Sequence, residues 1–349
     1  MVIGDGETFR QTSSTILSRL SGRKPLKSTR ICPRNQRTML FVTLHGGKPE
    51  SNPHKNNVHA YNKDGTLLTT SVLADDGAAI LDELRGIYLV DKYLYVVNAN
   101  KDQNGVLCYR GSGTKYTFVN KFAAKDTCNG ILHPFDLTFD NSGHCYISSQ
   151  DTNLVTRLTV SDNRQSAAPA PLAAALASKG HFYPGTFVGS NVANLGSQIT
   201  SIPSPAGLAY SDDGAKKHSV RGIVWTNNAL YVSDQPAGRI KIYDKNGKFL
   251  GQSNQVETPV HLVVWRGNLY VSGANEVLTA KLPDPPQDFI LSPIKGVKVK
   301  NGSGMAFSGS GHFYVASRTD RRILKFDAGF KPVKFDCKLP DNPEFLLHC

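Results

Sequence analysis

The sequence lacks the long apolar runs and the helical periodicity that mark membrane-spanning or helix-rich proteins. No window of the 349 residues approaches the roughly eighteen consecutive apolar residues that a membrane-crossing helix needs. No long stretch repeats apolar residues at the period of an amphipathic helix. The chain instead contains 31 glycines and 19 prolines, a composition typical of many short strands joined by turns. We therefore expect an all-β protein with no membrane span.

Cysteine is scarce and badly spaced for metal binding. No pair has the CxxC spacing of zinc sites among Cys32, Cys108, Cys128, Cys145, Cys337 and Cys349. The even number leaves disulfide bonds open. The chain also has no GxSxG nucleophile elbow, and RGSGTK at 110–115 lacks the Walker spacing of a nucleotide site. We predict no zinc site and no cofactor.

Acidic residues are outnumbered, with 28 against 40 basic residues and a net charge of +12. About half of the excess lies in residues 1–38, which we interpret as a basic N-terminal arm without the apolar core of a signal peptide. Residues 39–349 contain no basic–aromatic strip or nucleic-acid motif. We expect no nucleic-acid partner, and the sequence leaves the compartment open.

A short pattern recurs along the chain: a bulky apolar residue, an aromatic residue and a β-branched residue. The central aromatic residues are Phe41, Tyr95, Tyr146, Tyr231, Tyr270 and Tyr314. The copies follow an apolar strand pattern and a tight turn, as in RGIVWTNNALYVSD at 221–234, and a further strand comes next. A four-stranded unit repeated in this way predicts a six-bladed β-propeller over residues 39–349.

The repeat has two irregularities, one long step and one missing inner strand, and each leads to a prediction. The step from Tyr146 to Tyr231 is the longest, and no further copy of the pattern lies within it, so we expect six blades and an insertion at 161–219 that caps one face of the ring. The first repeat, beginning at Met39, has no inner strand before it, whereas NPEFLLHC at 342–349 has that pattern. We predict that this C-terminal strand pairs with the first blade and closes the ring.

The repeats resemble those of NHL-repeat proteins and of the related SMP-30/gluconolactonase-like six-bladed β-propellers. Blades of those families read as a strand, a Gly-rich turn, LYVAD, then RIxxFD and another turn, which ALYVSDQPAGRIKIYDKNG at 229–247 matches well. The resemblance covers about residues 39–349. It implies the propeller fold as a single domain, and it implies little about chemistry because propellers host unrelated functions.

In metal-dependent SMP-30-like enzymes the inner strands point acidic or amide residues at a calcium or zinc ion on the axis, just before the small residue of xG[LI]. The matching positions here are Arg85, Phe135, Arg221, Val260, Ser303 and Glu344, with Ala206 as the alternative to Arg221 in the fourth blade. A hard cation needs several oxygen ligands, and this set offers one carboxylate. The departure from the family pattern argues against a metal site.

The same set favours an anionic or carbonyl-bearing ligand held by Arg85 and Arg221, with Glu344 as their counter-ion. A salt-bridged plug that fills the tunnel is the alternative. Phe135 and Ser303 are further predicted binding residues, as is His133 near the pocket mouth. We predict that His261 and Asp136, which replace the usual glycine of the repeat, act in catalysis with Arg85. Hydrogen bonding of His261 and Asp136 to neighbouring blades is the other interpretation.

Three functions follow as hypotheses. The first is a metal-independent enzyme for a small, partly apolar substrate, since this chain looks like fungal natural-product propeller enzymes such as hetero-Diels–Alderases; a pericyclic step needs orientation and a hydrogen-bond donor more than a nucleophile. The second is an SMP-30-like metal-dependent lactonase or other hydrolase. The third is a non-catalytic NHL propeller that binds a protein partner.

Overall fold

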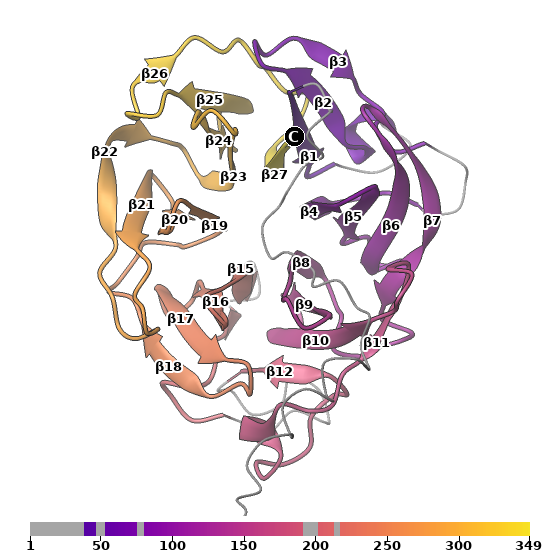
Figure 1. The fold of residues 1–349 in the computed structure, drawn as a ribbon, viewed down its shortest axis with the longest axis vertical. Coiled ribbons are helices and arrows are strands. Elements are labelled where there is room, and N and C mark those ends of the chain that lie inside the picture. Colours follow the sequence, from indigo (N-terminus) through magenta and orange to yellow (C-terminus); the bar gives the residue numbers. More distant parts are fainter. Residues whose placement is uncertain (1–37, 47–52, 75–79, 191–201, 213–216) are drawn as a thin grey trace, which may run out of the picture.

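The computed structural model describes residues 38–46, 53–74, 80–190, 202–212 and 217–349. The described strands form six antiparallel blades arranged around a central axis, which confirms the predicted all-β six-bladed propeller (Figure 1). In each blade the first strand of the sheet lies nearest the axis and the last lies at the circumference. No helix in the described part of the chain is long and apolar enough to cross a membrane.

The first three blades contain the N-terminal half of the fold together with the C-terminal strand β27. Blade one is ordered β27-β1-β2-β3, with β27 Pro343–His348, β1 Met39–Leu44, β2 His59–Asn62 and β3 Leu67–Thr69. Blade two consists of β4 Leu84–Val90, β5 Tyr93–Asn98, β6 Gly105–Ser112 and β7 Lys115–Ala124. Blade three consists of β8 Pro134–Phe139, β9 His144–Ser149, β10 Leu154–Val160 and β11 Ala167–Pro169, and β12 Thr186–Val188 also pairs with β10.

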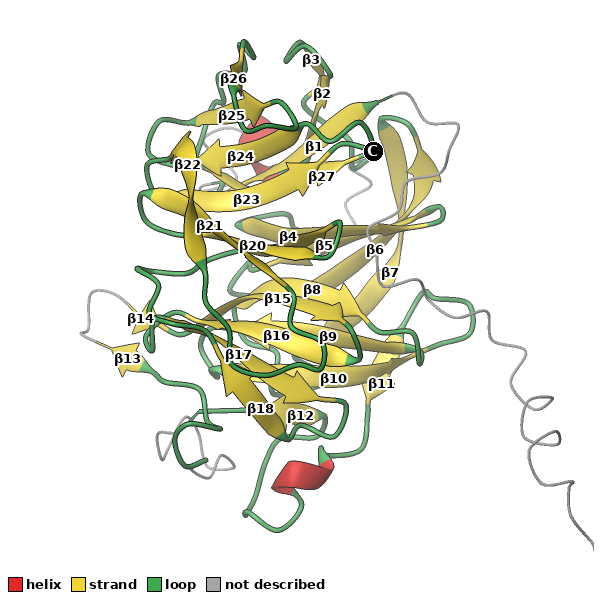
Figure 2. Cartoon of the chain, turned by 60° about the vertical axis from the view of Figure 1, so that its left-hand side comes forward, coloured by secondary structure: helices red, strands yellow, loops and turns green. Residues whose placement is uncertain are grey.

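The other three blades follow the same order. Blade four consists of β15 Val220–Thr226, β16 Ala229–Asp234, β17 Arg239–Asp244 and β18 Phe249–Gln252. Blade five consists of β19 Leu262–Trp265, β20 Asn268–Ser272, β21 Glu276–Lys281 and β22 Ser292–Lys298, and blade six of β23 Gly302–Phe307, β24 Phe313–Ser317, β25 Arg322–Phe326 and β26 Pro332–Val333. The minor elements are the antiparallel strand pair β13 Ser211–Asp212 and β14 Lys217–His218, and the 3₁₀ turns η1 Pro53–Asn56 and η2 Ala174–Leu176 (Figure 2).

The recurring aromatic residue explains how neighbouring blades pack. Six clusters of buried hydrophobic residues lie between successive blades of the described chain, and each contains one aromatic of the repeat. Tyr95, for example, packs its ring on Phe122 and Phe139, 4.8 and 5.0 Å away between centroids, and so joins blades two and three. Because strands near the axis are covered on both faces by other blades, β1 and β8 are buried along their whole length.

The C-terminal strand closes the ring, as predicted. β27 pairs with β1 through Leu40↔His348 and Phe41↔Leu347, and Met39 and Cys349 exchange two backbone hydrogen bonds of 2.6 and 2.8 Å. Cys349 is also disulfide-bonded. Without β27, blade one would present the open edge of β1 to solvent.

The residues of the first turn of blade four indicate its backbone conformation. Asn227 and Asn228 connect β15 to β16 with φ angles of 49° and 57°, so both occupy the left-handed region. Two such residues form the type I′ turn that matches the twist of a two-residue hairpin, and asparagine tolerates this conformation well.

The insertion at 161–219 lies along blades three and four in its described parts. β11 and β12 add to β10, and the Ala-rich stretch forms only the short turn η2, which meets the turn after β17 through a 3.1 Å bond from Ala175 N–H to Asn246 O. Farther on, Lys241 of β17 donates to the backbone carbonyl of Gly207, and Tyr243 donates to that of Ala206. The predicted cap over one face remains a prediction.

Candidate functional site

The inner strands carry the predicted axial residues to one level of the ring. Arg85, Phe135, Arg221, Ser303 and Glu344 are each the second residue of β4, β8, β15, β23 and β27. β15 begins at Val220 and pairs with β16, so Arg221 rather than Ala206 occupies the axial position of blade four. The shared register places these side chains at the same end of the central axis.

Glu344 is the centre of this group, with a side chain only 2% exposed. Its Oε1 lies 2.8 Å from Nη1 of Arg85, 2.6 Å from Nη2 of Arg318 and 3.0 Å from Nδ1 of His45. Burial acts to raise the pKa of Glu344, but the charges of Arg85 and Arg318 outweigh it and lower the pKa to about 2. The buried carboxylate is therefore ionised at neutral pH.

A second ionic group forms the rim beside Glu344. Glu83 accepts a 3.0 Å hydrogen bond from Nη2 of Arg85 and lies 3.2 Å from Nε2 of His133, whose Nδ1 lies 3.4 Å from Asp151. Burial disfavours the ionised forms of both Glu83 and His133, but their hydrogen bonds outweigh it. The pKa of Glu83 is lowered to about 2, and the pKa of His133 is raised. Two carboxylates thus favour the imidazolium form of His133.

Both acidic and basic partners at this rim adopt the left-handed backbone conformation. Glu83 and His133 each precede an inner strand, and their φ angles of 47° and 49° lie in the left-handed region, which is unusual for residues other than glycine. Asn301, which directly precedes β23, has a φ angle of 55°, so this conformation recurs where inner strands begin and does not by itself mark a functional site.

Arg221 lies on the other side of the axial group. Its Nε donates a 2.8 Å hydrogen bond to Gln235, and its guanidinium carbon lies 5.2 Å from the ring centroid of Phe135. Arg85 approaches the same ring at 5.8 Å. Burial, with the positive charge of Arg85 next in weight, lowers the pKa of Arg221 to about 9, despite the opposing charge of Glu344. A negative group placed here would be stabilised.

The predicted catalytic residues Asp136 and His261 directly follow the axial positions of Phe135 and Val260 and are fully buried; Asp136 lies in β8, and His261 directly precedes β19. Asp136 accepts backbone hydrogen bonds of 2.8 Å from Leu137 and 3.1 Å from Ile223 of the next blade. His261 accepts a 3.0 Å bond at Nδ1 from the amide of Met305, also in the next blade. These contacts join blades, and catalysis by Asp136 or His261 remains a prediction.

Ser303 has the same kind of contact. Its hydroxyl donates a 2.7 Å bond to the carbonyl of Pro343, which links blade six to the closing strand. Ser148 donates likewise to the carbonyl of Arg221, and Ser233 to that of Pro259. These geometries indicate a structural role for Ser303, and its predicted role in ligand binding remains a prediction.

Several residues of the site lay outside the sequence prediction. Glu83 and Asp151 come from connections between strands. His45, Gln235 and Arg318, however, are each the fourth residue after a repeat aromatic, namely Phe41, Tyr231 and Tyr314. Because the strand that carries the aromatic ends at this face in every blade, that offset was a usable signal.

The donor set does not suit a metal ion. No group of three or more His, Cys, Asp or Glu side chains able to hold a metal occurs in the described part of the chain. Glu344, the one axial carboxylate, has an oxygen contacted by two guanidiniums, with which a hard cation would compete.

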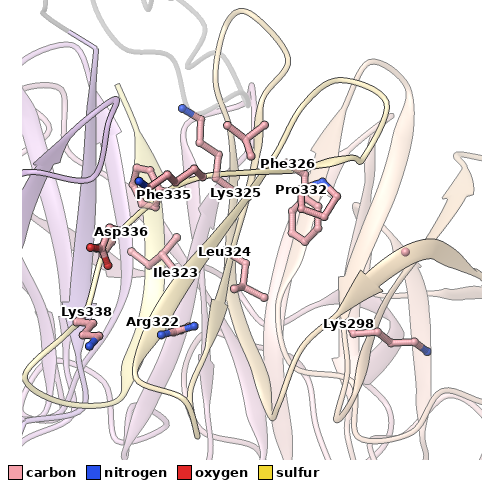
Figure 3. A pocket seen from close by; sticks show the side chains of 14 residues that line it. Lys298, Arg322, Ile323, Leu324, Lys325, Phe326, Pro332, Phe335, Asp336 and Lys338 are labelled. Carbon is pink, nitrogen blue, oxygen red and sulfur yellow. The ribbon is translucent and has the colours of Figure 1, made fainter.

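Two surface hollows lie away from the axis. One, of about 400 Å³, lies between the outer strands of blades five and six (Figure 3). The other, of about 520 Å³, is lined by residues 101–107 and 121–129 of blade two. Neither is lined by the axial residues.

Comparison with known proteins identifies the fold and nothing finer. No family model and no curated protein matches the chain. A solved protein from Lactobacillus plantarum is 13% identical, with a TM-score of 0.53 over 90% of this chain and 99% of its own. The chain is a six-bladed β-propeller.

Two further structures support the same conclusion. A chain of the nidogen/laminin complex is 12% identical with a TM-score of 0.52, over 89% of this chain and 97% of its own. A putative 6-phosphogluconolactonase from Bacteroides uniformis is 11% identical with a TM-score of 0.50, over 85% and 81%. At such identities the likeness of this propeller to these proteins concerns architecture alone.

Proposed function

We propose that this propeller is an enzyme for a small organic molecule that carries a carboxylate or a polarised carbonyl. We call the end of the central axis where Arg85, Arg221, Arg318 and Glu344 lie the axial mouth, and we place the substrate there. The observation that carries the proposal is the convergence of three guanidiniums, those of Arg85, Arg221 and Arg318, around the single axial carboxylate of Glu344. Planar guanidinium groups match the geometry of carboxylate and carbonyl oxygens. A bound anion would relieve the repulsion among the three cations.

The roles divide by exposure. Arg85 is 7% exposed, and its two terminal nitrogens are already bonded to Glu83 and Glu344, so its role is to hold these carboxylates in place. Arg318 is 25% exposed, and Arg221 is partly exposed over Phe135. These two guanidiniums are the groups that bind the oxygen of the substrate, and the ring of Phe135 supports its apolar part.

The reaction that suits these groups is a cyclisation, of which a hetero-Diels–Alder step is one case. A cycloaddition forms its bonds between the two reacting π systems without a leaving group, so the protein must orient them and stabilise charge that develops on oxygen. Arg221 and Arg318 provide hydrogen-bond donors for that oxygen, and His133 bridges the carboxylates of Glu83 and Asp151 at the rim. A metal-dependent lactonase has less support, because the axial carboxylate is bonded to arginines.

The test is an equilibrium titration with small carboxylates of graded apolar size, such as acetate, benzoate and 2-naphthoate. We expect binding that tightens with apolar area and weakens at least tenfold in Arg221→Ala, since each strong ion-pair contact is worth about 1.5–3 kcal/mol. Arg221→Lys should recover part of the affinity. Arg266→Ala is the matched control, because Arg266 is an exposed arginine stacked on Trp265 of blade five.

Three results would count against this function. One is that none of the carboxylates binds, and another is that Arg221→Ala binds within twofold of the unsubstituted protein. The third is a protein partner captured equally well by the protein and by Arg221→Ala, which would favour a binding propeller.

A further inference from the structure

The hollow between blades five and six has the composition of a second binding site. Its walls come from β22, from β25 and β26, and from the connection that follows β26 (Figure 3). All of these lie in the outer part of their blades, whereas the axial residues lie on the inner strands. Whatever occupies this hollow would therefore be distinct from a ligand at the axis.

The first argument is charge. Five cationic residues line the hollow against one carboxylate, that of Asp336; the cations are Lys298, Arg322, Lys325, Lys334 and Lys338. Residues 39–349 carry only about half of the net charge of +12, so much of their excess is concentrated at this hollow. Such a concentration produces a local positive potential that attracts anions.

The second argument is that most of this charge is not neutralised within the described chain. Lys298, Arg322, Lys334 and Lys338 are exposed, and no described acidic residue forms a salt bridge with any of them. Lys325 differs, because its ammonium donates a 2.8 Å hydrogen bond to the carbonyl of Lys63 and lies over Tyr314 and Phe335. Figure 3 shows Arg322 between Lys298 and Lys338 along one side of the hollow.

The third argument is shape. β25 pairs with β26 at Lys325↔Val333 and Phe326↔Pro332, and the two segments meet again at an isolated bridge between Arg322 and Lys338. Between these two pairings β25 spans three residues, from Lys325 to Arg322, whereas the segment after β26 spans five, from Val333 to Lys338. The longer segment therefore curves away from β25. Residues of both segments line the space that opens beside β25.

The volume and the lining together define the ligand class. About 400 Å³ lies within the range of small-molecule sites, which is roughly 300–1,000 Å³. Several cations around one small space favour a group with more than one negative charge or several acceptor oxygens. The apolar side chains of Leu324, Pro332 and Phe335 in the lining suit an organic substituent. We propose that this hollow binds an organic ester of phosphate or sulfate, independently of the axial mouth.

The experiment is a calorimetric titration of the full chain with phenyl phosphate and, separately, phenyl sulfate, with phenol as the uncharged comparison. We expect at least one ester to bind and phenol not to bind. The tighter ester identifies the oxyanion. The double variant Arg322→Glu/Lys338→Glu should weaken binding at least tenfold, and it should fold because both side chains are exposed.

Lys248→Glu is the matched charge-reversal control, since Lys248 is an exposed lysine in blade four, and it should bind within twofold of the unsubstituted protein. Arg221→Ala should also leave ester binding unchanged. The proposal is overturned if neither ester binds, if the double variant binds as tightly as the unsubstituted protein, or if Arg221→Ala abolishes ester binding. Failure of carboxylates to bind at the axis would leave this result unaffected.

Discussion

At the residue scale, the unusual feature is a fully ionised carboxylate, Glu344, on the last strand of the chain. Removing an ion from water costs several kcal/mol, and Arg85, Arg318 and His45 offset that cost through direct contacts. The arrangement holds three cationic or protonatable groups in place around one anion. It serves the closing strand and the proposed binding mouth together.

The first prediction of this scale concerns pH. The folded pKa of Glu344 is about 2 and its ordinary value is 4.5, so its ionisation stabilises the fold above pH 4.5 and that contribution disappears as the pH falls toward 2. The shift corresponds to roughly 3 kcal/mol. Glu344→Gln should therefore lower the free energy of unfolding by about 3 kcal/mol at pH 7 and flatten its decline below pH 4.5, as measured by urea denaturation.

The matched control is Glu257→Gln, because Glu257 has an exposed side chain. It should unfold like the unsubstituted protein at both pH values. An unchanged stability of Glu344→Gln at pH 7 would show that the axial ion pairs contribute no net stability.

Register explains which residues could be predicted from the sequence. Arg85, Arg221 and Glu344 were placed on the axis by matching the inner strands to the xG[LI] pattern of the SMP-30-like propellers that the sequence resembles. Glu83 and Asp151 could not be placed, because they lie in connections between strands, and their contacts with His133 depend on how blades two and three fold together. Asp136 and His261 interrupt the glycine of the repeat, and that departure alone could not separate a catalytic role from an inter-blade contact.

At the element scale, the six inner strands alternate between glycine and a larger residue around the axis. The glycines are Gly86, Gly222 and Gly304, and the larger residues on the strands that follow them are Asp136, His261 and Phe345. A Cβ added to Gly304 would lie 2.5 Å from the Cα of Phe345. Each glycine therefore gives the next strand room to approach.

This alternation yields a matched pair of substitutions in blade six. Gly304→Ala should destabilise the fold by about 2 kcal/mol or more, because an added methyl group forces the backbone of the closing strand to move. Gly309→Ala is the control, since a Cβ there would meet nothing within 4 Å. Thermal unfolding measures both, and equal melting temperatures for the two variants would refute the close packing of inner strands.

At the scale of the whole molecule, the ring is closed by pairing the two ends of the described fold. β1 and β27 are 302 residues apart where the amide of Phe345 donates to the hydroxyl of Thr43. The hydroxyl of Thr43 in turn donates to the backbone carbonyl of Arg85. The Thr43 side chain therefore links blade one to blade two. The strand pattern of the last residues predicted this closure, whereas the path of the insertion along blades three and four depends on tertiary contacts that no periodic pattern encodes.

The molecule thus presents two separate cationic regions, an axial mouth and a hollow at the rim of blades five and six. The central claim is that the mouth binds a carboxylate or carbonyl oxygen. The most direct measurement is a crystal structure of the protein with the tightest carboxylate of the titration series. The account predicts density for its carboxylate within hydrogen-bond distance of both Arg221 and Arg318, with the apolar part against Phe135. A well-occupied ligand elsewhere, with the mouth closed by its own side chains, would contradict it.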